Sequence, residues 1–325
     1  MRRPIPLPDG LGARFRVRDA VDAGATLTHL RRAGLDAPFW GIRSIPVDPD
    51  LSELDPFARQ AAERRMKARA FIPRLGDGQF YSHETAAALL GGPLPLRWLA
   101  PGVAADGRDL DVHVSSFGEG PIPRANGIHG HRANVACRFF VARDGAQIAR
   151  PETAWAQLGG SLSVIDLVTL GDFFCRMWRE GYGRRDAGTP PLTTIDRLRS
   201  TMNGVRWRGI RRLREAIELV REDSWSPRES AVRFHLVTAG LPEPALNVDV
   251  FDDFGLFLGC VDMAYPDQKV AVEYHGELHH AQYAADVERM AALRAAGWTI
   301  IEVTSALFAR PEELVARVRI ALRGR

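Results

Sequence analysis

The pattern of apolar and polar positions is clearest in the last 100 residues, where helical spacing and strand-like runs alternate. Ser226-Pro227-Arg228-Glu229 has the form of a helix start with an N-cap serine, a proline in the first turn and a glutamate that reaches back. The expected elements are, in order, a helix over 227–239, strands over 256–264 and 269–275, a helix over 284–296, a strand over 298–303 and a helix over 311–322. This order predicts an α/β fold with a mixed sheet flanked by helices.

The middle of the chain, residues 76–194, mixes both patterns and predicts an α+β domain. Ser82 is placed to cap a helix that runs to Leu90 and ends at Gly91-Gly92-Pro93. The other expected elements are strands over 110–114 and 134–141 and a helix over 161–174.

Three histidines of this middle region are candidates for a metal site: His113, His129 and His131. No carboxylate is fixed beside them, and Gly127 and Gly130 indicate a loop. We therefore interpret them as loop histidines that bind no metal.

Residues 1–75 predict a region similar to a winged helix-turn-helix. The stretch 16–34 forms two short helices around a turn, in which Ala20 and Gly24 have the small-residue spacing of close helices and Thr26 caps the second helix. Residues 39–43 follow as a strand or wing, and residues 55–71 as a further helix. The second helix carries Arg31 and Arg32, which we expect to contact nucleic acid. The alternative is an ordinary helical hairpin with a solvated basic face.

Composition narrows the class of protein. Apolar residues make up 46% of the chain, no run of about 18 of them exists, and the N-terminus lacks the apolar stretch of a secretory signal. The three cysteines fit neither a zinc spacing nor a disulfide framework. We therefore expect a cytoplasmic protein with reduced thiols and no membrane partner.

Arginine dominates the basic residues, although the net charge is only +3. Of 43 basic residues, only Lys67 and Lys269 are lysines. Arginine presents a planar fork of donors to phosphate oxygens, but the codon bias of a GC-rich genome also explains the excess. Clustering is therefore the more informative feature. Seven arginines and no acid occur between residues 197 and 214: Arg197, Arg199, Arg206, Arg208, Arg211, Arg212 and Arg214.

This arginine-rich segment introduces a third region, residues 195–325. We expect Arg206, Arg208, Arg211 and Arg212 to contact DNA phosphates, and a solvated helix face is the alternative.

The candidate chemistry lies in the hairpin of the third region. Side chains alternate faces along a strand, so Glu273 shares a face with Ala271 and His275. Folding the hairpin at Pro266-Asp267 sets Asp262 opposite Ala271, with Glu273 as its diagonal neighbour at about 7–8 Å.

Two acids on adjacent apolar strands repel one another unless a cation lies between them. Oxygen ligands with open positions suit Mg2+ or Mn2+, which activates water and stabilises charge on a phosphate. Asp262 and Glu273 are thus the expected metal ligands and catalytic acids of a phosphodiesterase. The alternative is that one of the acids is paired with an arginine.

Further polar residues extend this candidate site. His275, His279 and His280 follow the second strand, and a histidine there can act as general acid or base, orient water or bind the metal. Glu229 is a third acid. Its position in the capping sequence explains it without catalysis, and a position near the metal is the other interpretation.

At these residues the sequence resembles the PD-(D/E)xK, or restriction-endonuclease-like, nuclease superfamily, and within it the branch of the very-short-patch mismatch-repair endonuclease. The resemblance covers Ser226 to Arg325. It rests on the strand 259–266 with Asp262, on Val272-Glu273-Tyr274-His275-Gly276, and on His279-His280. It implies Mg2+-dependent cutting of DNA with Asp262 as a metal ligand. The usual lysine of the superfamily is absent, and His275 stands in its place, as in the mismatch-repair branch.

The remainder of the chain is similar, more weakly, to antitoxin-like proteins of abortive-infection systems, which carry an N-terminal winged helix-turn-helix. The matching residues are Asp19-Ala20 with Gly24, Ser82-His83 with Ala86-Ala87, and Asp166-Leu167 with Gly171-Asp172. This similarity implies DNA binding upstream of the nuclease-like domain.

The sequence therefore predicts a Mg2+- or Mn2+-dependent DNA endonuclease that acts on double-stranded DNA. The competing hypothesis is a DNA-binding transcriptional regulator or antitoxin with an inactive nuclease-like domain, whose toxin or other protein partner the sequence does not identify. RNA cleavage is a weaker third hypothesis, because no stacking platform typical of RNA-binding modules is present.

Overall fold

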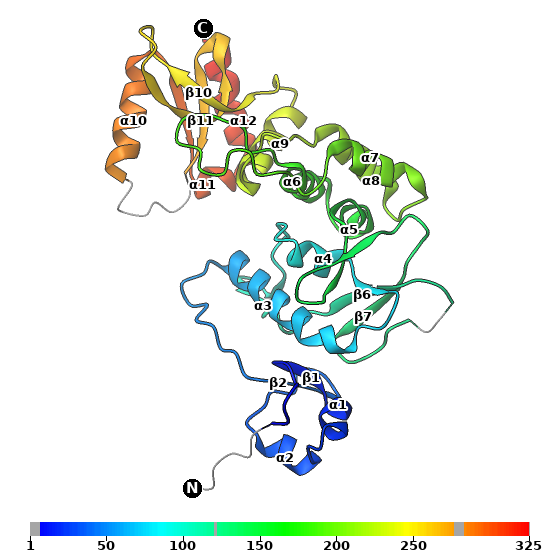
Figure 1. Ribbon diagram of the computed structural model, residues 1–325. Helices are drawn as coiled ribbons and strands as arrows, with labels where there is room; N and C mark the ends of the chain where they lie inside the picture. The colour runs from blue at the N-terminus through cyan, green and yellow to red at the C-terminus, as the bar shows by residue number, and fades with distance from the viewer. Residues whose placement is uncertain (1–6, 120–121, 276–282, 325) are drawn as a thin grey trace. The chain divides into compact units, whose positions relative to one another are not determined.

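The computed structural model describes residues 7–119, 122–275 and 283–324. The chain forms two compact units: unit 1 consists of Met1–Ser161 with Ser200–Ile210, and unit 2 of Leu162–Arg199 with Arg211–Arg325. Figure 1 shows the helices and strands of both units. They make a mixed α/β protein with several sheets, as the sequence predicted at this coarse level.

The first part of unit 1 contains the two short helices expected there. Its elements are β1 (Arg14–Arg16), α1 (Val17–Asp22), α2 (Leu27–Arg32) and β2 (Ile42–Ser44). Thr26 caps α2, because its hydroxyl accepts a hydrogen bond from the backbone N–H of His29. The expected strand at 39–43 begins later, at Ile42, and pairs with β1, a strand that the sequence pattern did not reveal.

The rest of unit 1 is built on a five-stranded sheet in the order β7-β6-β3-β9-β8. Its elements are α3 (Pro56–Phe71), η1 (Ile72–Arg74), β3 (Gln79–Tyr81), α4 (His83–Leu89), β4 (Trp98–Ala100), β5 (Val103–Ala104), β6 (Val112–Ser116), β7 (Ile128–Arg132), β8 (Phe139–Val141), β9 (Gln147–Ala149) and α5 (Pro151–Leu158). Asp55 starts α3 by accepting hydrogen bonds from the backbone N–H groups of Phe57 and Ala58.

Three expectations for this part of the chain were wrong. Ser82 occupies the N-cap position of α4, but its side chain makes no capping hydrogen bond. Residues 134–138 are not part of a strand, and β8 begins only at Phe139. His129 and His131 lie on β7 rather than in a loop. Gly130 is compatible with this strand because it provides room for a close neighbour: a Cβ atom there would lie 2.1 Å from the carbonyl oxygen of Pro123.

Unit 2 contains a four-stranded mixed sheet in the order β10-β11-β12-β13. Its elements are α6 (Val164–Cys175), α8 (Ile210–Leu219), α9 (Pro227–Thr238), β10 (Ala245–Phe251), β11 (Phe257–Tyr265), η2 (Pro266–Gln268), β12 (Val270–Tyr274), α10 (Tyr283–Ala295), β13 (Thr299–Val303), α11 (Ser305–Phe308) and α12 (Pro311–Arg323). Six of these match the expected elements within about two residues; β10 and α11 were not expected.

Helices cover both faces of this sheet (Figure 1). On one face, Val232 and Leu236 of α9 and Leu314 and Val318 of α12 pack with Val272 of the sheet. On the other face, Met290 and Leu293 of α10 pack against Ala264 and Ala271. The alternation along β12 explains this division, since Val272 and Ala271 point to opposite sides.

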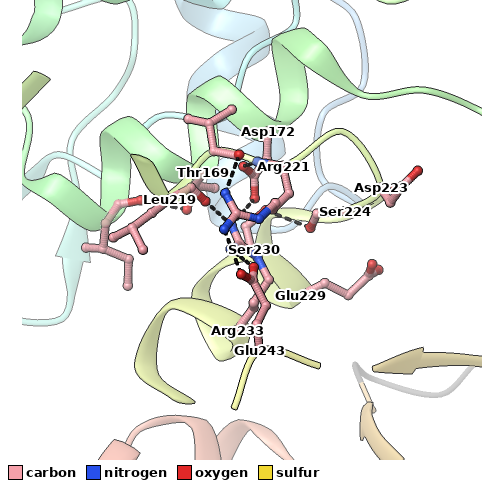
Figure 2. A network of polar contacts seen from close by, with 12 residues as sticks. Thr169, Asp172, Leu219, Arg221, Asp223, Ser224, Glu229, Ser230, Arg233 and Glu243 are labelled. Carbon is pink, nitrogen blue, oxygen red and sulfur yellow. Dashed lines mark hydrogen bonds and ion pairs between the residues drawn. The ribbon is translucent and has the colours of Figure 1, made fainter. Parts of the chain in front are cut away.

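The two units differ from the three regions of the sequence because α6, in the middle region, belongs with α9. Arg233 of α9 and Asp172 of α6 form an ion pair in which both side chains are 0% exposed. Figure 2 shows the surrounding network, in which Arg233 also bonds Glu243 and the carbonyl of Leu219. One of the three boundaries between the units, Arg199/Ser200, lies within helix α7 (Ile195–Gly204). Among the described residues, no helix is both long and apolar enough to cross a membrane.

Candidate active site

Asp262 and Glu273 lie on neighbouring antiparallel strands, β11 and β12. Met263 pairs with Val272 and Ala264 with Ala271, so the next position along the ladder sets Asp262 beside Glu273. The expected register, with Asp262 opposite Ala271, was wrong by two residues. The acids are therefore closer than a diagonal pair.

The turn of the hairpin explains the different register. Tyr265 pairs with Val270, which leaves a connection of four residues instead of a tight bend at Pro266-Asp267. The short helix η2 occupies three of these positions, and Lys269 completes the turn in the left-handed region at φ 46°.

Asp262 is half-buried and has no ion-pair partner among the residues that the structure describes. Its Oδ2 accepts a hydrogen bond from the backbone N–H of Tyr274 at 2.8 Å. Burial raises the pKa of Asp262 well above the usual range, and the charges of Glu273 and Glu229 raise it further. This carboxylate thus lies in a place where a cation would be favoured.

Glu273 is 4% exposed and pairs with a guanidinium. Arg289 of α10 donates from Nη1 to Oε1 at 3.1 Å and from Nη2 to Oε2 at 3.5 Å. Burial raises the pKa of Glu273 even though Arg289 acts in the opposite direction. The alternative considered from the sequence, an acid paired with an arginine, therefore holds for Glu273, whereas Asp262 has no such pair in the described ranges.

Arg289 was not singled out from the sequence. Its Nη1 also donates to the carbonyl oxygen of Cys260 at 3.0 Å, so the side chain bridges β11 and β12. Gly259 makes room for it, because a Cβ atom there would lie 2.8 Å from Cδ of Arg289. The glycine in the apolar strand was a usable signal for a close approach, although it did not identify the approaching residue.

Glu229, at the start of α9, is 6% exposed and has a structural role. The hydroxyl of Ser226 accepts a hydrogen bond from the backbone N–H of Glu229, as the capping sequence predicted. The carboxylate bonds the N–H of Trp225 at 3.0 Å rather than that of Ser226, so the reciprocal half of the capping box is shifted by one residue. The charge of Glu229 raises the pKa of Asp262, by less than burial and the charge of Glu273 do, so Glu229 also lies near the site.

Asn247 connects Glu229 to the sheet and was also missed. Its Nδ2 donates to Oε2 of Glu229 at 3.1 Å. Leu246 pairs with Met263 and Val248 with Val261, so Asn247 lies opposite Asp262 on β10. It has a positive φ of 50°, which is uncommon for a residue other than glycine and occurs here within the site.

His275 follows β12 directly. Its backbone N–H donates to the carbonyl oxygen of Val303. Within the described part of the chain, its buried Nε2 has no hydrogen-bond partner. His279 and His280 fall in 276–282, outside the described residues.

The ligand geometry is incomplete for a three-acid metal site. Three metal ligands need one ligand atom each within a few ångström of the others. In the described ranges, ring nitrogens of His83, His113 and His131 lie within 4.8 Å of one another, whereas the carboxylate oxygens of Glu229, Asp262 and Glu273 do not form such a group. Two oxygen ligands on adjacent strands remain, one of them paired with Arg289. A hard divalent cation fits these oxygens if Glu273 exchanges its guanidinium for the ion.

The arginines expected to bind nucleic acid are distributed over both units. Arg31 is exposed on α2, and the side chain of Arg32 is outside the described residues. The others are exposed but divided: Arg206 and Arg208 belong to unit 1, and Arg211 and Arg212 to unit 2. Arg212 also donates to the carbonyl oxygen of Leu162.

Trp207, in the middle of the arginine-rich segment, is 6% exposed and donates to the carbonyl oxygen of Thr201. It is a core residue and not a stacking platform. DNA binding by this segment stays a prediction.

No known protein family and no solved structure matches the chain. The chain is similar to two uncharacterized proteins of Mycobacterium tuberculosis, one from strain CDC 1551 / Oshkosh and one from strain H37Rv. Each is 33% identical over 115 residues, which is 34% of this chain and 42% of the relative. The match thus spans less than half of each relative's length.

Proposed function

We propose that unit 2 is a metal-dependent endonuclease of the PD-(D/E)xK type that hydrolyses phosphodiester bonds in double-stranded DNA. The observation that carries the proposal is the direct juxtaposition of Asp262 and Glu273 on β11 and β12, with Asp262 left without a cationic partner among the described residues. The four-stranded mixed sheet with helices on both faces is compatible with that fold.

Asp262 and Glu273 would hold Mg2+ or Mn2+. A bound ion of this kind lowers the pKa of water and offsets charge on the phosphate. The backbone N–H of Tyr274 holds one oxygen of Asp262 in place and leaves the other for a ligand. Asn247 and Trp225 hold Glu229 in a similar way, so that it acts on Asp262 through its charge.

The remaining groups suit binding and proton transfer. Nε2 of His275, which lacks a partner among the residues described, is the atom that would accept or return a proton in place of the superfamily's lysine. Arg289 would contact the phosphate once Glu273 binds the ion, since a guanidinium matches phosphate oxygens. The N-terminal β1-α1-α2-β2 arrangement, with Arg31 exposed, supports a DNA-binding role for that winged-helix-like part.

Cutting of supercoiled plasmid by the full-length chain in Mg2+ or Mn2+ tests this function. We expect relaxed or linear product with the wild type and at least about a 100-fold lower rate with Asp262→Asn, because the substitution removes a metal-binding charge. Asp267→Asn is the matched control: it is exposed in the turn of the same hairpin and should cut like the wild type. Equal rates for Asp262→Asn and wild type would refute the proposal.

The ion pair between Glu273 and Arg289 favours the second candidate, a DNA-binding regulator or antitoxin whose nuclease-like domain is inactive. If the guanidinium of Arg289 stays bound to Glu273, that carboxylate is not available to bind a metal ion. Such a protein should select a preferred DNA sequence and bind it tightly without cutting it in Mg2+. Cleavage by the wild type contradicts this candidate, and tight sequence-selective binding without any cleavage supports it.

A further inference from the structure

Four histidines of unit 1 gather on one side of its five-stranded sheet, and the proposed nuclease site does not use them. On the parallel strands β6 and β7, His113 lies opposite His129, and Ser115 opposite His131. His83 begins α4, which packs against β6. The rings of His83 and His131 stack with centroids 3.8 Å apart, and those of His129 and His131 with centroids 4.6 Å apart.

Ring nitrogens of three of these residues come close enough to share an ion. One ligand atom each of His83, His113 and His131 lies within 4.8 Å of the other two. Nδ1 of His113 is 2.9 Å from Nε2 of His131. A tetrahedral zinc ion with nitrogens at about 2.1 Å requires nitrogens about 3.4 Å apart, which small side-chain rotations would achieve from these positions.

These three histidine side chains are partly buried. Burial lowers the pKa of His113 and of His131 to about 4, and it lowers the pKa of His83 further.

Neighbouring residues contact the ring of His83 and hold the backbone of His83 and His113. The hydroxyl of Ser82 lies 3.0 Å from Nδ1 of His83, which leaves Nε2 of that ring for a ligand. His83 has a positive φ of 49°, and its backbone N–H donates to Oε1 of Gln157. The backbone N–H of His113 donates to the hydroxyl of Thr85.

The chemistry of the donor set selects the class of metal. Glu84, the nearest acid in sequence, is 8% exposed and pairs with Arg64 and Arg97. The available donors are then imidazole nitrogens, which favour zinc, copper, nickel, cobalt or iron over magnesium. The exposed His129, whose ring centroid is 4.6 Å from that of His131, lines a hollow of about 360 Å3.

We propose that His83, His113 and His131 bind one divalent transition-metal ion of the zinc class, with a fourth position left for water. The ion links the start of α4 to β6 and β7. It is separate from the Mg2+ site proposed for unit 2, because it uses nitrogen ligands from unit 1 alone.

Titration of chelator-treated, full-length protein with Co2+ and then Zn2+ tests this site. The first equivalent of Co2+ should produce the intense visible bands of four-coordinate, nitrogen-rich Co2+, and Zn2+ should abolish them. His131→Asn should remove these bands. Ser82→Ala removes a residue that contacts a ligand but not the metal, and it should weaken Zn2+ binding by about 10- to 100-fold. His131→Asn removes a ligand and should weaken Zn2+ binding by more than this.

Two control variants separate this site from other candidate ligands. Asp262→Asn tests the proposed nuclease site, and His279→Gln/His280→Gln tests the histidines outside the described residues; both should retain the bands. A circular dichroism spectrum like that of the wild type shows that His131→Asn is folded, and Zn2+ should raise the melting temperature of the wild type but not of this variant.

Absence of the Co2+ bands in the wild type, their retention in folded His131→Asn, or their loss in either control would overturn the proposal. None of these results depends on nuclease activity, so the metal site and the proposed function can fail separately.

Discussion

Replacing Arg233 by methionine tests how unit 2 holds α9, and with it Glu229, against α6. The guanidinium of Arg233 donates to Oδ2 of Asp172 at 3.0 Å, to Oε1 of Glu243 at 3.0 Å and to the carbonyl oxygen of Leu219 at 2.6 Å (Figure 2). Arg233 and Asp172 are both 0% exposed, so solvent does not compensate either charge when the other is removed.

The magnitude follows from what the substitution leaves behind. In Arg233→Met, Asp172 keeps the backbone N–H of Arg221 at 2.7 Å but loses its buried cation. Breaking a buried ion pair from one side costs about 3–5 kcal/mol. Glu243 remains paired with Arg221, so its loss of Arg233 adds little. We therefore expect the free energy of unfolding of unit 2 to fall by about 3–5 kcal/mol.

The double variant Asp172→Leu/Arg233→Met is the decisive comparison. Replacement of both charges by apolar groups of similar volume is often neutral or stabilising, so the double variant should be more stable than Arg233→Met. Hydrogen exchange measured by mass spectrometry on the full chain follows α6 and α9 separately from unit 1. A loss below about 1 kcal/mol in Arg233→Met, or equal losses in the single and double variants, would show that the pair does not hold these helices together.

Three further predictions follow from individual contacts. Gly259→Ala should displace Arg289, since the new Cβ would lie 2.8 Å from Cδ of Arg289. The loss in the rate of DNA cleavage in the double variant Gly259→Ala/Arg289→Ala should therefore be smaller than the sum of the two single losses. Additive losses in the double variant would contradict this reasoning. Thr26→Ala should destabilise α2 by about 1 kcal/mol through loss of its N-cap, measured as weaker protection of its amides from exchange, whereas the exposed Thr28→Ala should leave that protection unchanged. Metal-free protein should lose stability as the pH falls from 6.5 towards 4, because the unfolded chain takes up protons on His113 and His131 before the folded one does. The midpoints of urea unfolding at several pH values check this. An unchanged dependence of the midpoint on pH in His131→Asn would contradict it.

The architecture of unit 2 was largely predictable because its apolar alternation is strong. Val270 and Val272 are both 0% exposed and face one core, while Ala271 faces the other. The five residues of β12 were therefore sufficient to predict the strand. The helix starting at Pro227 was equally clear from its capping sequence. Local rules were sufficient where both the element and its buried face are encoded within one short stretch.

The details that failed depend on partners distant in sequence. β10 was missed, and with it Asn247, whose role depends on Glu229 18 residues earlier. The histidines of β7 were predicted to lie in a loop because Gly127 and Gly130 were interpreted as loop residues. The structure shows that this glycine accommodates Pro123 instead. The Arg289–Glu273 pair joins α10 to β12, and the spacing of residues along the chain did not indicate it.

The charge balance at the candidate active site gives a last prediction. Three carboxylates lie near one another, and among the described residues one guanidinium, that of Arg289, pairs with one of them. Burial raises the pKa of both Asp262 and Glu273. A carboxyl group with a raised pKa in the folded state favours folding less as the pH rises through that pKa, because the folded chain then loses a proton that it held more tightly than the unfolded chain did.

A divalent cation would offset this cost by replacing the proton. Mg2+ binding should therefore release protons, and the Mg2+ concentration for half-maximal cleavage should fall as the pH rises through the raised pKa of these carboxyl groups. Calorimetry in two buffers of different ionisation enthalpy measures the proton release directly, with Asp262→Asn as the control that should release fewer protons. Mg2+ binding without proton release, together with a cleavage midpoint that does not change with pH, would mean that these carboxylates are not the groups that hold the ion.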